Sequence, residues 1–178
     1  MRRIPTVNDV LKCLTKRRSV RRYTQEQVTP EKLKAILKAG LYAPSGMNRQ
    51  STVMLVIQDK EVISELSRLN AEIMGRDFDP FYGAPTVVVV LADKNVMTYV
   101  EDGSLVMGNL MNAAFSVGVD SCWIHRARQV FDTEYGRQLL RRHGISDDYV
   151  GIGNCILGYH DCKLPDASER RDNRIYNI

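Results

Sequence analysis

The segment from Asp102 to Val117 carries apolar side chains on nearly every face of the helix that it would form. A helix that is apolar all round has to be covered on all sides. A chain of 178 residues has little room for such a helix unless a second subunit helps to cover it. The segment therefore predicts a central helix and a dimer. Its apolar positions are Leu105, Val106, Met107, Leu110, Met111, Ala113, Ala114, Phe115 and Val117.

The other periodic segments predict a mixture of helices and strands. Helices are expected near the N-terminus with Thr6 as cap, from Pro30 after the Thr29 cap, around 62–69 and over 132–143. Because two helices precede the first strand, an α+β arrangement is favoured over a doubly wound parallel sheet. The length suits a single domain over residues 1–178. Strands are expected over 53–57, 86–92, 119–124 and 149–157.

The bulk composition is that of an ordinary globular protein, with 44% apolar and 26% charged residues. The longest apolar run, Val87–Ala92, is too short to cross a bilayer, and residues 1–5 lack the apolar stretch of a signal peptide. We therefore expect a cytoplasmic protein without membrane contact. Four cysteines without a CxxC pair predict reduced, mostly buried thiols and no metal site.

The positive charge of the chain is concentrated near its two ends. The stretch KRRSVRRY, residues 16–23, places five cations in eight positions, and a second cluster of arginines occupies 170–174. One interpretation is a basic arm that binds nucleic acid. The other is a pocket for one phosphate, with both clusters converging on a small anion.

Motif searches exclude several classes of enzyme. The sequence has no GxxxxGK[ST], GxSxG or HExxH motif, and GIGNCILG (151–158) has the pattern of a core strand in which glycines permit close packing. What remains is an arginine-rich anion site and a loop with Asn and Gln, APSGMNRQ (43–50). That combination fits a cofactor enzyme, and flavin mononucleotide (FMN) would use both parts: guanidinium groups for its phosphate and amides for its ring edge.

Four segments in this order resemble the FMN-dependent nitroreductase family: KRRSVRRY, APSGMNRQ, DGSLVMGNLMNAAFSVGVDSCWIH (102–125) and ERRDNRIYNI (169–178). The resemblance covers roughly residues 7–178. It implies an α+β fold with a central mixed or antiparallel sheet flanked by helices, in an obligate domain-swapped homodimer. It further implies FMN at the subunit interface and ping-pong reduction of small-molecule acceptors, such as nitroaromatics or quinones, by NADH or NADPH.

The resemblance also implies a set of cofactor-binding residues, with no catalytic side chain because the flavin N5 carries the chemistry. Residues 17–21 would bind the phosphate, ribityl chain and pyrimidine edge, and residues 45–50 would come from the other subunit. Residues 123–126 would lie beside the flavin ring, with a backbone N–H near N5, and Arg170 would close on the phosphate. Ser168 stands where the family often has a second tail cation. The full set is Arg17, Arg18, Ser19, Arg21, Ser45, Met47, Asn48, Gln50, Trp123, Ile124, His125, Arg126 and Arg170.

Two alternatives stay open at this point. The first is another flavin reaction on the same fold, such as dehalogenation, flavin fragmentation or desaturation. The second is a basic module without enzymatic activity that binds nucleic acid through residues 2–22, although this hypothesis leaves the Asn/Gln loop and the apolar helix unexplained.

Overall fold

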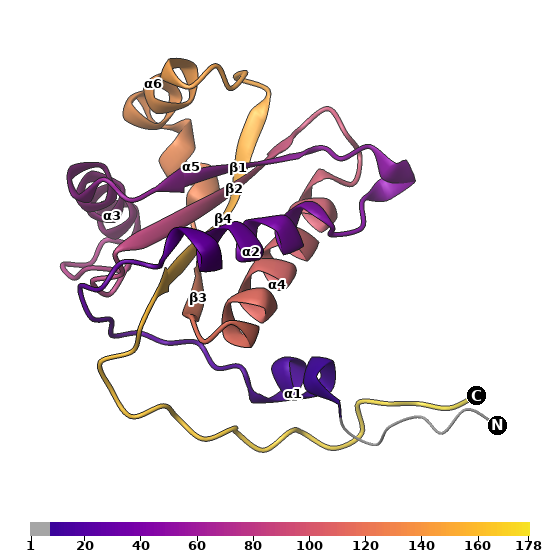
Figure 1. The fold of residues 1–178 in the computed structure, drawn as a ribbon. Coiled ribbons are helices and arrows are strands. Elements are labelled where there is room, and N and C mark those ends of the chain that lie inside the picture. The colour runs from indigo at the N-terminus through magenta and orange to yellow at the C-terminus, as the bar shows by residue number, and fades with distance from the viewer. Residues whose placement is uncertain (1–7) are drawn as a thin grey trace.

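The computed structural model describes residues 8–178 and shows a four-stranded antiparallel sheet with helices on both faces (Figure 1). The strand order is β1-β2-β4-β3, so β2 and β4 form the centre of the sheet. This arrangement confirms the predicted α+β class. The strands are β1 (Thr52–Ile57), β2 (Thr86–Asp93), β3 (Asp120–Ile124) and β4 (Tyr149–Gly158).

The central strand β2 divides the core into two layers. Its side chains alternate between the faces, so that Val87 and Val89 join one hydrophobic cluster while Val88 and Val90 join the other. All four valines are fully buried. A strand buried on both faces explains why this segment reads as a continuous apolar run rather than as an alternating one.

Each face of the sheet is covered by its own helices. On one face, α4 (Tyr99–Ser116) packs on the sheet with α2 (Pro30–Leu41) beside it, and α1 (Asp9–Lys16) contacts α4. On the other face lie α3 (Lys60–Met74), α5 (Ala127–Asp132) and α6 (Glu134–Arg142). A short 3₁₀ turn, η1 (Gly46–Asn48), follows α2. None of the helices within residues 8–178 has the length and apolarity that a bilayer crossing would require.

The predicted helix starts are partly confirmed. Thr29 caps α2 by accepting a hydrogen bond from the backbone N–H of Lys32, with Pro30 in the first turn. The predicted cap Thr6 lies outside the described residues, and the first helix as described begins at Asp9 with Asn8 as its cap. Asn8 Oδ1 accepts from the N–H of Leu11 at 2.9 Å.

The helix predicted over 132–143 forms as α6 (Glu134–Arg142), and a further helix that was not predicted, α5 (Ala127–Asp132), precedes it. Thr133 has an extended backbone and its hydroxyl accepts a hydrogen bond from the N–H of Gly136 at 3.2 Å, which starts α6 as a separate element. A Cβ on Gly136 would lie 2.4 Å from the carbonyl oxygen of Val130. The two helices therefore meet at a sharp turn that only a small residue permits.

The central apolar helix, α4, begins at Tyr99, three residues before the predicted start at Asp102. Its inner side, with Met107 and Leu110, is fully buried against the sheet and α2. Its outer side is not covered within one chain: Leu105 is 46% exposed, and a Cβ on Gly108 would meet no atom within 4 Å. The described residues, 8–178, therefore bury one side of this helix and leave the other open.

Candidate functional site

The arginine-rich segment after α1 lies against the edge strand β3. The N–H of Val20 donates to the carbonyl oxygen of Ser121 at 3.1 Å, and Ser19 forms a β-bridge with the same residue. The hydroxyl of the buried Tyr23 donates to the carbonyl oxygen of Val20 at 2.9 Å. Burial raises the pKa of this phenol above its ordinary value, so the hydroxyl stays a donor. These contacts fix the backbone from which the arginine side chains extend.

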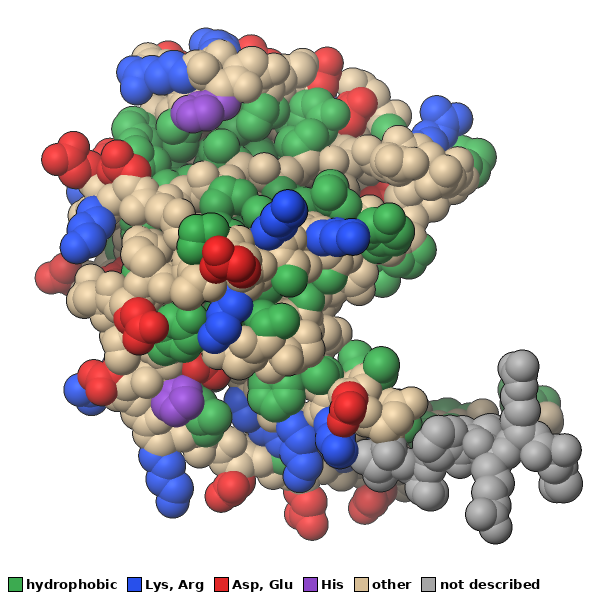
Figure 2. Space-filling view, in the orientation of Figure 1, with side chains coloured by type: hydrophobic (Ala, Val, Ile, Leu, Met, Phe, Trp, Pro, Cys, Tyr) green, Lys and Arg blue, Asp and Glu red, His purple; other side chains and the backbone are tan. Residues whose placement is uncertain are grey.

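The four arginines of the segment have different surroundings. Arg17 is half-buried, and among residues 8–178 its buried Nη1 has no hydrogen-bond partner. Arg18 donates from Nη1 to the carbonyl oxygens of Thr15 and Arg17 at 2.9 and 2.7 Å. Arg21 is exposed, and Arg22 pairs with Asp161 at the surface. Figure 2 shows Lys and Arg side chains gathered beside α1 on the lower part of this face. Of these four arginines, Arg17 is the one with a buried guanidinium nitrogen that finds no partner among residues 8–178.

The segment from Trp123 to Arg126 continues the edge strand β3, which the arginine-rich segment contacts at Ser121. Burial raises the pKa of the Cys155 thiol to about 12, and the nearby Arg17 guanidinium partly opposes this rise. Cys155 belongs to the core layer under α4 and is the register partner of Trp123, which packs on that layer. Arg17 lies two positions before Ser19, which bridges Ser121, and Trp123 lies two positions after Ser121 on the same strand.

A cavity of about 300 Å³ opens over the Trp123–Arg126 segment. Trp123 is half-buried, and its buried Nε1 has no hydrogen-bond partner within residues 8–178, while Ile124 is buried in the opposite layer. His125 and Arg126 reach the cavity from the turn after β3. The lining contains no carboxylate, so the cavity suits a planar or anionic group. It consists of Tyr99, Val100, Ser104, Trp123, His125, Arg126, Arg128, Gln129, Gly151 and Ile152.

Two buried amides that the sequence analysis did not single out hold the turn after β3. The side-chain N–H₂ of Asn70, on α3, donates to the carbonyl oxygen of His125 at 2.9 Å. Asn154, on β4, donates to the carbonyl oxygens of Ile124 and His125 at 3.3 and 3.5 Å. The sequence signal for both was a polar residue among apolar ones: Asn70 in the apolar stripe of a helix, and Asn154 in a core strand.

The loop with Ser45, Met47, Asn48 and Gln50 forms η1 and its flanks. Ser45 Oγ accepts from the N–H of Gln50 at 3.0 Å, and the Gln50 side chain donates to Asn48 Oδ1 at 3.3 Å. Met47, Asn48 and Gln50 all have positive φ, between 49° and 53°. Met47 is 76% exposed. Unfavourable backbone angles at three positions of one exposed loop are typical of a segment that contacts a ligand or another chain.

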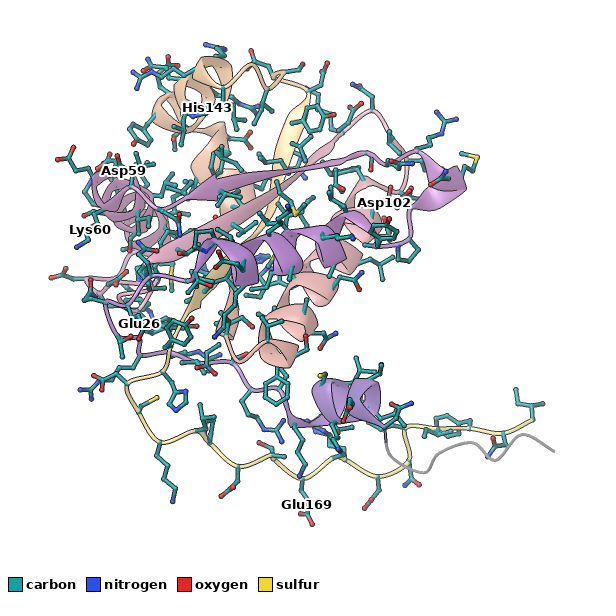
Figure 3. All side chains as sticks on the ribbon, viewed as in Figure 1. Glu26, Asp59, Lys60, Asp102, His143 and Glu169 are labelled. Atoms are coloured by element: carbon teal, nitrogen blue, oxygen red, sulfur yellow. The ribbon has the colours of Figure 1, made fainter. Side chains whose placement is uncertain are left out.

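A buried carboxylate anchors this loop to α4. Asp102 is 2% exposed and accepts from the N–H of Gly46 at 2.9 Å and from the Ser51 hydroxyl at 2.7 Å. The Thr98 hydroxyl also donates to it, at 3.2 Å. Figure 3 shows Asp102 at the end of α4 that faces η1. The carboxylate thus uses its acceptor capacity to hold the loop in place.

The structure does not bring all the predicted site residues together within one chain. The 45–50 loop is bonded to the first turn of α4, whereas Ser19 contacts Ser121, five positions after the last residue of that helix. A helix of 18 residues is roughly 27 Å long, so the two segments lie about one helix length apart. Figure 1 shows η1 and α1 toward opposite ends of α4.

The tail arginines lie on a segment without helix or strand, and Arg170 is exposed. Figure 3 places its neighbour Glu169 on the extended tail, which runs along the side of the molecule where α1 lies. Arg170 instead lines a tail cavity of about 580 Å³, together with Arg171, Asn173, Arg174 and Ile175.

The remaining histidines and cysteines have structural surroundings. His143 Nδ1 lies 3.0 Å from the carbonyl oxygen of Leu139, and His160 pairs with Asp120 at 2.7 Å. All four cysteines are free thiols. Within residues 8–178 there is no group of three side chains suited to hold a metal ion.

Comparison with known proteins places these features in a family. The profile of the Nitroreductase family matches residues 14–80. An Archaeoglobus fulgidus protein, provisionally named an NADH dehydrogenase/NAD(P)H nitroreductase, is 31% identical over 159 residues, covering 86% of each chain.

Solved structures agree with this assignment. A nitroreductase with bound FMN from Bacteroides fragilis superposes with a TM-score of 0.88 at 28% identity, covering 97% of this chain and 100% of the other. An iodotyrosine deiodinase bound to FMN and 3-iodo-L-tyrosine, at 22% identity and a TM-score of 0.76, shares the fold over 95% of this chain and 99% of its own. The extent and identity of the match to the archaeal relative, together with the profile match, show that this chain belongs to the nitroreductase family.

Proposed function

We propose that this chain is an FMN-dependent NAD(P)H oxidoreductase that works as a homodimer and reduces nitroaromatic, quinone or related small-molecule acceptors in a ping-pong cycle. In this proposal residues 1–178 form one FMN-binding domain. The observation that carries it is the half-buried Arg17, whose buried Nη1 has no partner among the described residues, in a segment that bridges β3, the strand that leads into the Trp123–Arg126 cavity. An unpaired buried cation is costly and is expected where an anionic ligand completes it.

The residues of this segment and of the cavity fit FMN. Arg17, supported by Ser19 and Arg18, would bind the phosphate, because a guanidinium matches phosphate geometry with paired hydrogen bonds. Trp123, Ile124, His125 and Arg126 would border the ring, and Arg21 would lie toward its pyrimidine edge. FMN, when bound, would supply the hydride-accepting chemistry. The protein's part would be to hold the ring, keep water from it and leave room for a nicotinamide or an acceptor.

A second copy of the chain would complete the site. The uncovered side of α4 and the strained 45–50 loop both lack a partner that explains them within one chain. A partner subunit that packs on α4 would carry Ser45, Met47, Asn48 and Gln50 of its own loop to the flavin of the first. The tail would exchange in the same way, with Arg170 closing on a phosphate. The exposed apolar side chains of α1 and α4 are consistent with such an interface.

The proposal is tested by purifying the full chain and recording its absorbance spectrum. We expect a yellow protein with flavin bands that bleach when NADH or NADPH is added anaerobically and return when a quinone or nitroaromatic is supplied. Light scattering should give twice the mass of the 20.2 kDa chain. A colourless protein that takes up no FMN from solution would contradict the proposal. Bleaching without acceptor turnover would favour another reaction on the same fold.

A further inference from the structure

The peptide bond between His125 and Arg126 is held by an unusual pair of contacts. Its carbonyl oxygen accepts from Asn70 of α3 at 2.9 Å and from Asn154 of β4 at 3.5 Å. Both asparagines are almost fully buried, at 0% and 1% exposure. Two donors from different elements therefore fix the direction in which this carbonyl points.

The residue that follows is held in a left-handed conformation. Arg126 has φ +69°, a backbone conformation that is unfavourable for a residue other than glycine. The carbonyl oxygen of Arg126 accepts the bond that begins α5, from the N–H of Val130 at 3.0 Å. A Cβ on Gly151 would lie 2.4 Å from the backbone carbon of Ala127, so α5 starts in direct contact with β4. The turn cannot shift without moving one of these elements.

The orientation of the carbonyl determines the orientation of the next N–H. Residues 8–178 contain no cis peptide bond, and in a trans peptide the C=O and N–H point in opposite directions. The carbonyl of His125 points toward α3, so the N–H of Arg126 points toward the other side of the sheet, where the Trp123 cavity lies. No partner for this N–H is found in the described part of the chain.

Each of the two asparagines donates to the turn but leaves its own side-chain acceptor without a partner in the described part of the chain. Among residues 8–178 the buried Oδ1 atoms of Asn70 and Asn154 have no hydrogen-bond partner. Each such acceptor lowers the stability of the folded chain, because it has lost its hydrogen bonds to water. Apolar residues at these positions would remove the two unsatisfied acceptors but would leave the carbonyl of His125 without its donors, so the amides stand where the direction of this carbonyl has to be fixed.

We propose that Asn70 and Asn154 are positioning residues that keep the N–H of Arg126 directed at the flavin N5 and prevent this peptide from turning over. The inference rests on the proposed function. Oxidised flavin has an acceptor at N5, whereas reduced flavin carries a hydrogen there. A fixed N–H therefore favours binding of oxidised FMN, while a peptide free to rotate could offer the His125 carbonyl to the reduced form.

The test measures FMN dissociation constants for oxidised and reduced flavin in Asn70→Leu and Asn154→Leu, which keep the volume of the side chain and remove its donor. We expect the ratio of the oxidised to the reduced constant to rise about tenfold in each variant. For a two-electron couple this corresponds to a midpoint potential about 30 mV higher. Asn109→Leu is the matched control, because it loses an equivalent 2.9 Å bond to the carbonyl of Ala39 on another face.

The outcomes separate this inference from the proposed function. If the wild-type chain binds no FMN, the proposed function is wrong. If it binds FMN but both variants keep the wild-type ratio within twofold, or Asn109→Leu changes it equally, the positioning role is wrong. Should Asn154→Leu fail to fold, Asn70→Leu decides the question, since its single bond comes from a separate helix.

Discussion

Arg17 and Arg22 belong to the same basic segment but differ in burial and in pairing. Arg17 is half-buried, with a guanidinium nitrogen that finds no partner among residues 8–178. Arg22 lies at the surface and pairs with Asp161 at 3.3 Å, with both side chains more than half exposed. An exposed pair of this kind contributes little to stability. The difference predicts that ligand binding depends on Arg17 and hardly on Arg22.

Replacing Arg17 with Gln should weaken FMN binding by about 10- to 100-fold, because a hydrogen bond to a charged group is worth about 1.5–3 kcal/mol. The measurement is a titration of the apoprotein followed by flavin fluorescence. Arg22→Gln is the control, and its affinity should stay within about twofold. Equal losses in both variants would mean that the segment acts only through its total charge.

Cys155 gives a prediction about pH. Burial raises the pKa of its thiol from 9.0 to about 12. Below pH 9 the thiol is protonated in both the folded and the unfolded chain. Above pH 9 the unfolded chain loses this proton while the folded chain keeps it. The stability that the thiol contributes is therefore lost as the pH rises toward 12. Between about pH 8 and pH 10.5, the free energy of unfolding of wild type should therefore fall more steeply than that of Cys155→Ala, by up to about 1.4 kcal/mol per pH unit.

Urea unfolding at several pH values measures the two slopes. Cys162→Ala, which removes an exposed thiol, should keep the wild-type slope. Identical slopes for Cys155→Ala and wild type would show that another group carries the alkaline loss of stability.

The residues that the sequence analysis missed share one property. Asn70 and Asn154 bond the backbone of His125 across 55 and 29 positions, and Asp102 bonds Gly46 across 56. Local periodicity predicts which face a residue lies on, but not which distant backbone group it meets. The predicted arginines were easier to recognise because their charge alone stands out from the sequence.

At the scale of elements, β4 shows why a glycine pattern can mislead. GIGNCILG begins like a nucleotide-binding turn, but it forms a central strand whose glycines make room for neighbours, as predicted. A Cβ on Gly153 would lie 2.5 Å from Nε1 of Trp123, and one on Gly158 would contact Tyr23 and Pro85. The strand is therefore shaped around the side chains that border the site.

Gly153→Ala should destabilise the protein by about 1–3 kcal/mol and displace Trp123, because an added methyl group in a close-packed region forces its neighbours to move. Urea unfolding gives the first quantity. The emission of Trp123, the only tryptophan in the chain, gives the second. A folded variant with unchanged stability and emission would show that Trp123 is not held by this strand.

Elements with strong local signals were predicted well, and those set by tertiary contact were not. The Thr29-Pro30 start and the boundaries of β4 needed only capping and apolar patterns. The separation of α5 from α6 at Thr133 depends on how Gly136 packs against Val130 and Phe131. That contact forms only once both helices are in place, and α5, with six residues, is too short to show a helical period, so the sequence analysis did not predict it.

At the scale of the whole molecule, the open side of α4 is the feature that a single chain leaves unexplained. The apolar stripe of α1 is also exposed, at Val10, Leu11 and Leu14. Exposed apolar surface on neighbouring helices is typical of an interface. The same face carries the Trp123 cavity, so assembly and cofactor binding would depend on one surface.

Leu105→Asp should convert the proposed dimer to a monomer at micromolar concentration and remove its bound FMN, because a carboxylate would be buried without a partner. Light scattering and the flavin absorbance report the two effects. Ile73→Asp is the matched control: Ile73 is also partly exposed but lies on α3, on the opposite face of the sheet, and this variant should stay dimeric and yellow. A dimeric Leu105→Asp protein would place the interface elsewhere.

The different burial of the four thiols has a practical consequence. Cys122 and Cys155 are buried and Cys13 is half-buried, whereas Cys162 is exposed at the beginning of the C-terminal tail. A maleimide dye should therefore couple preferentially at Cys162, and replacing Cys13 alone should make the labelling specific. Energy transfer from Trp123 to that dye would then report whether the tail folds onto a neighbouring chain, as the proposed dimer requires.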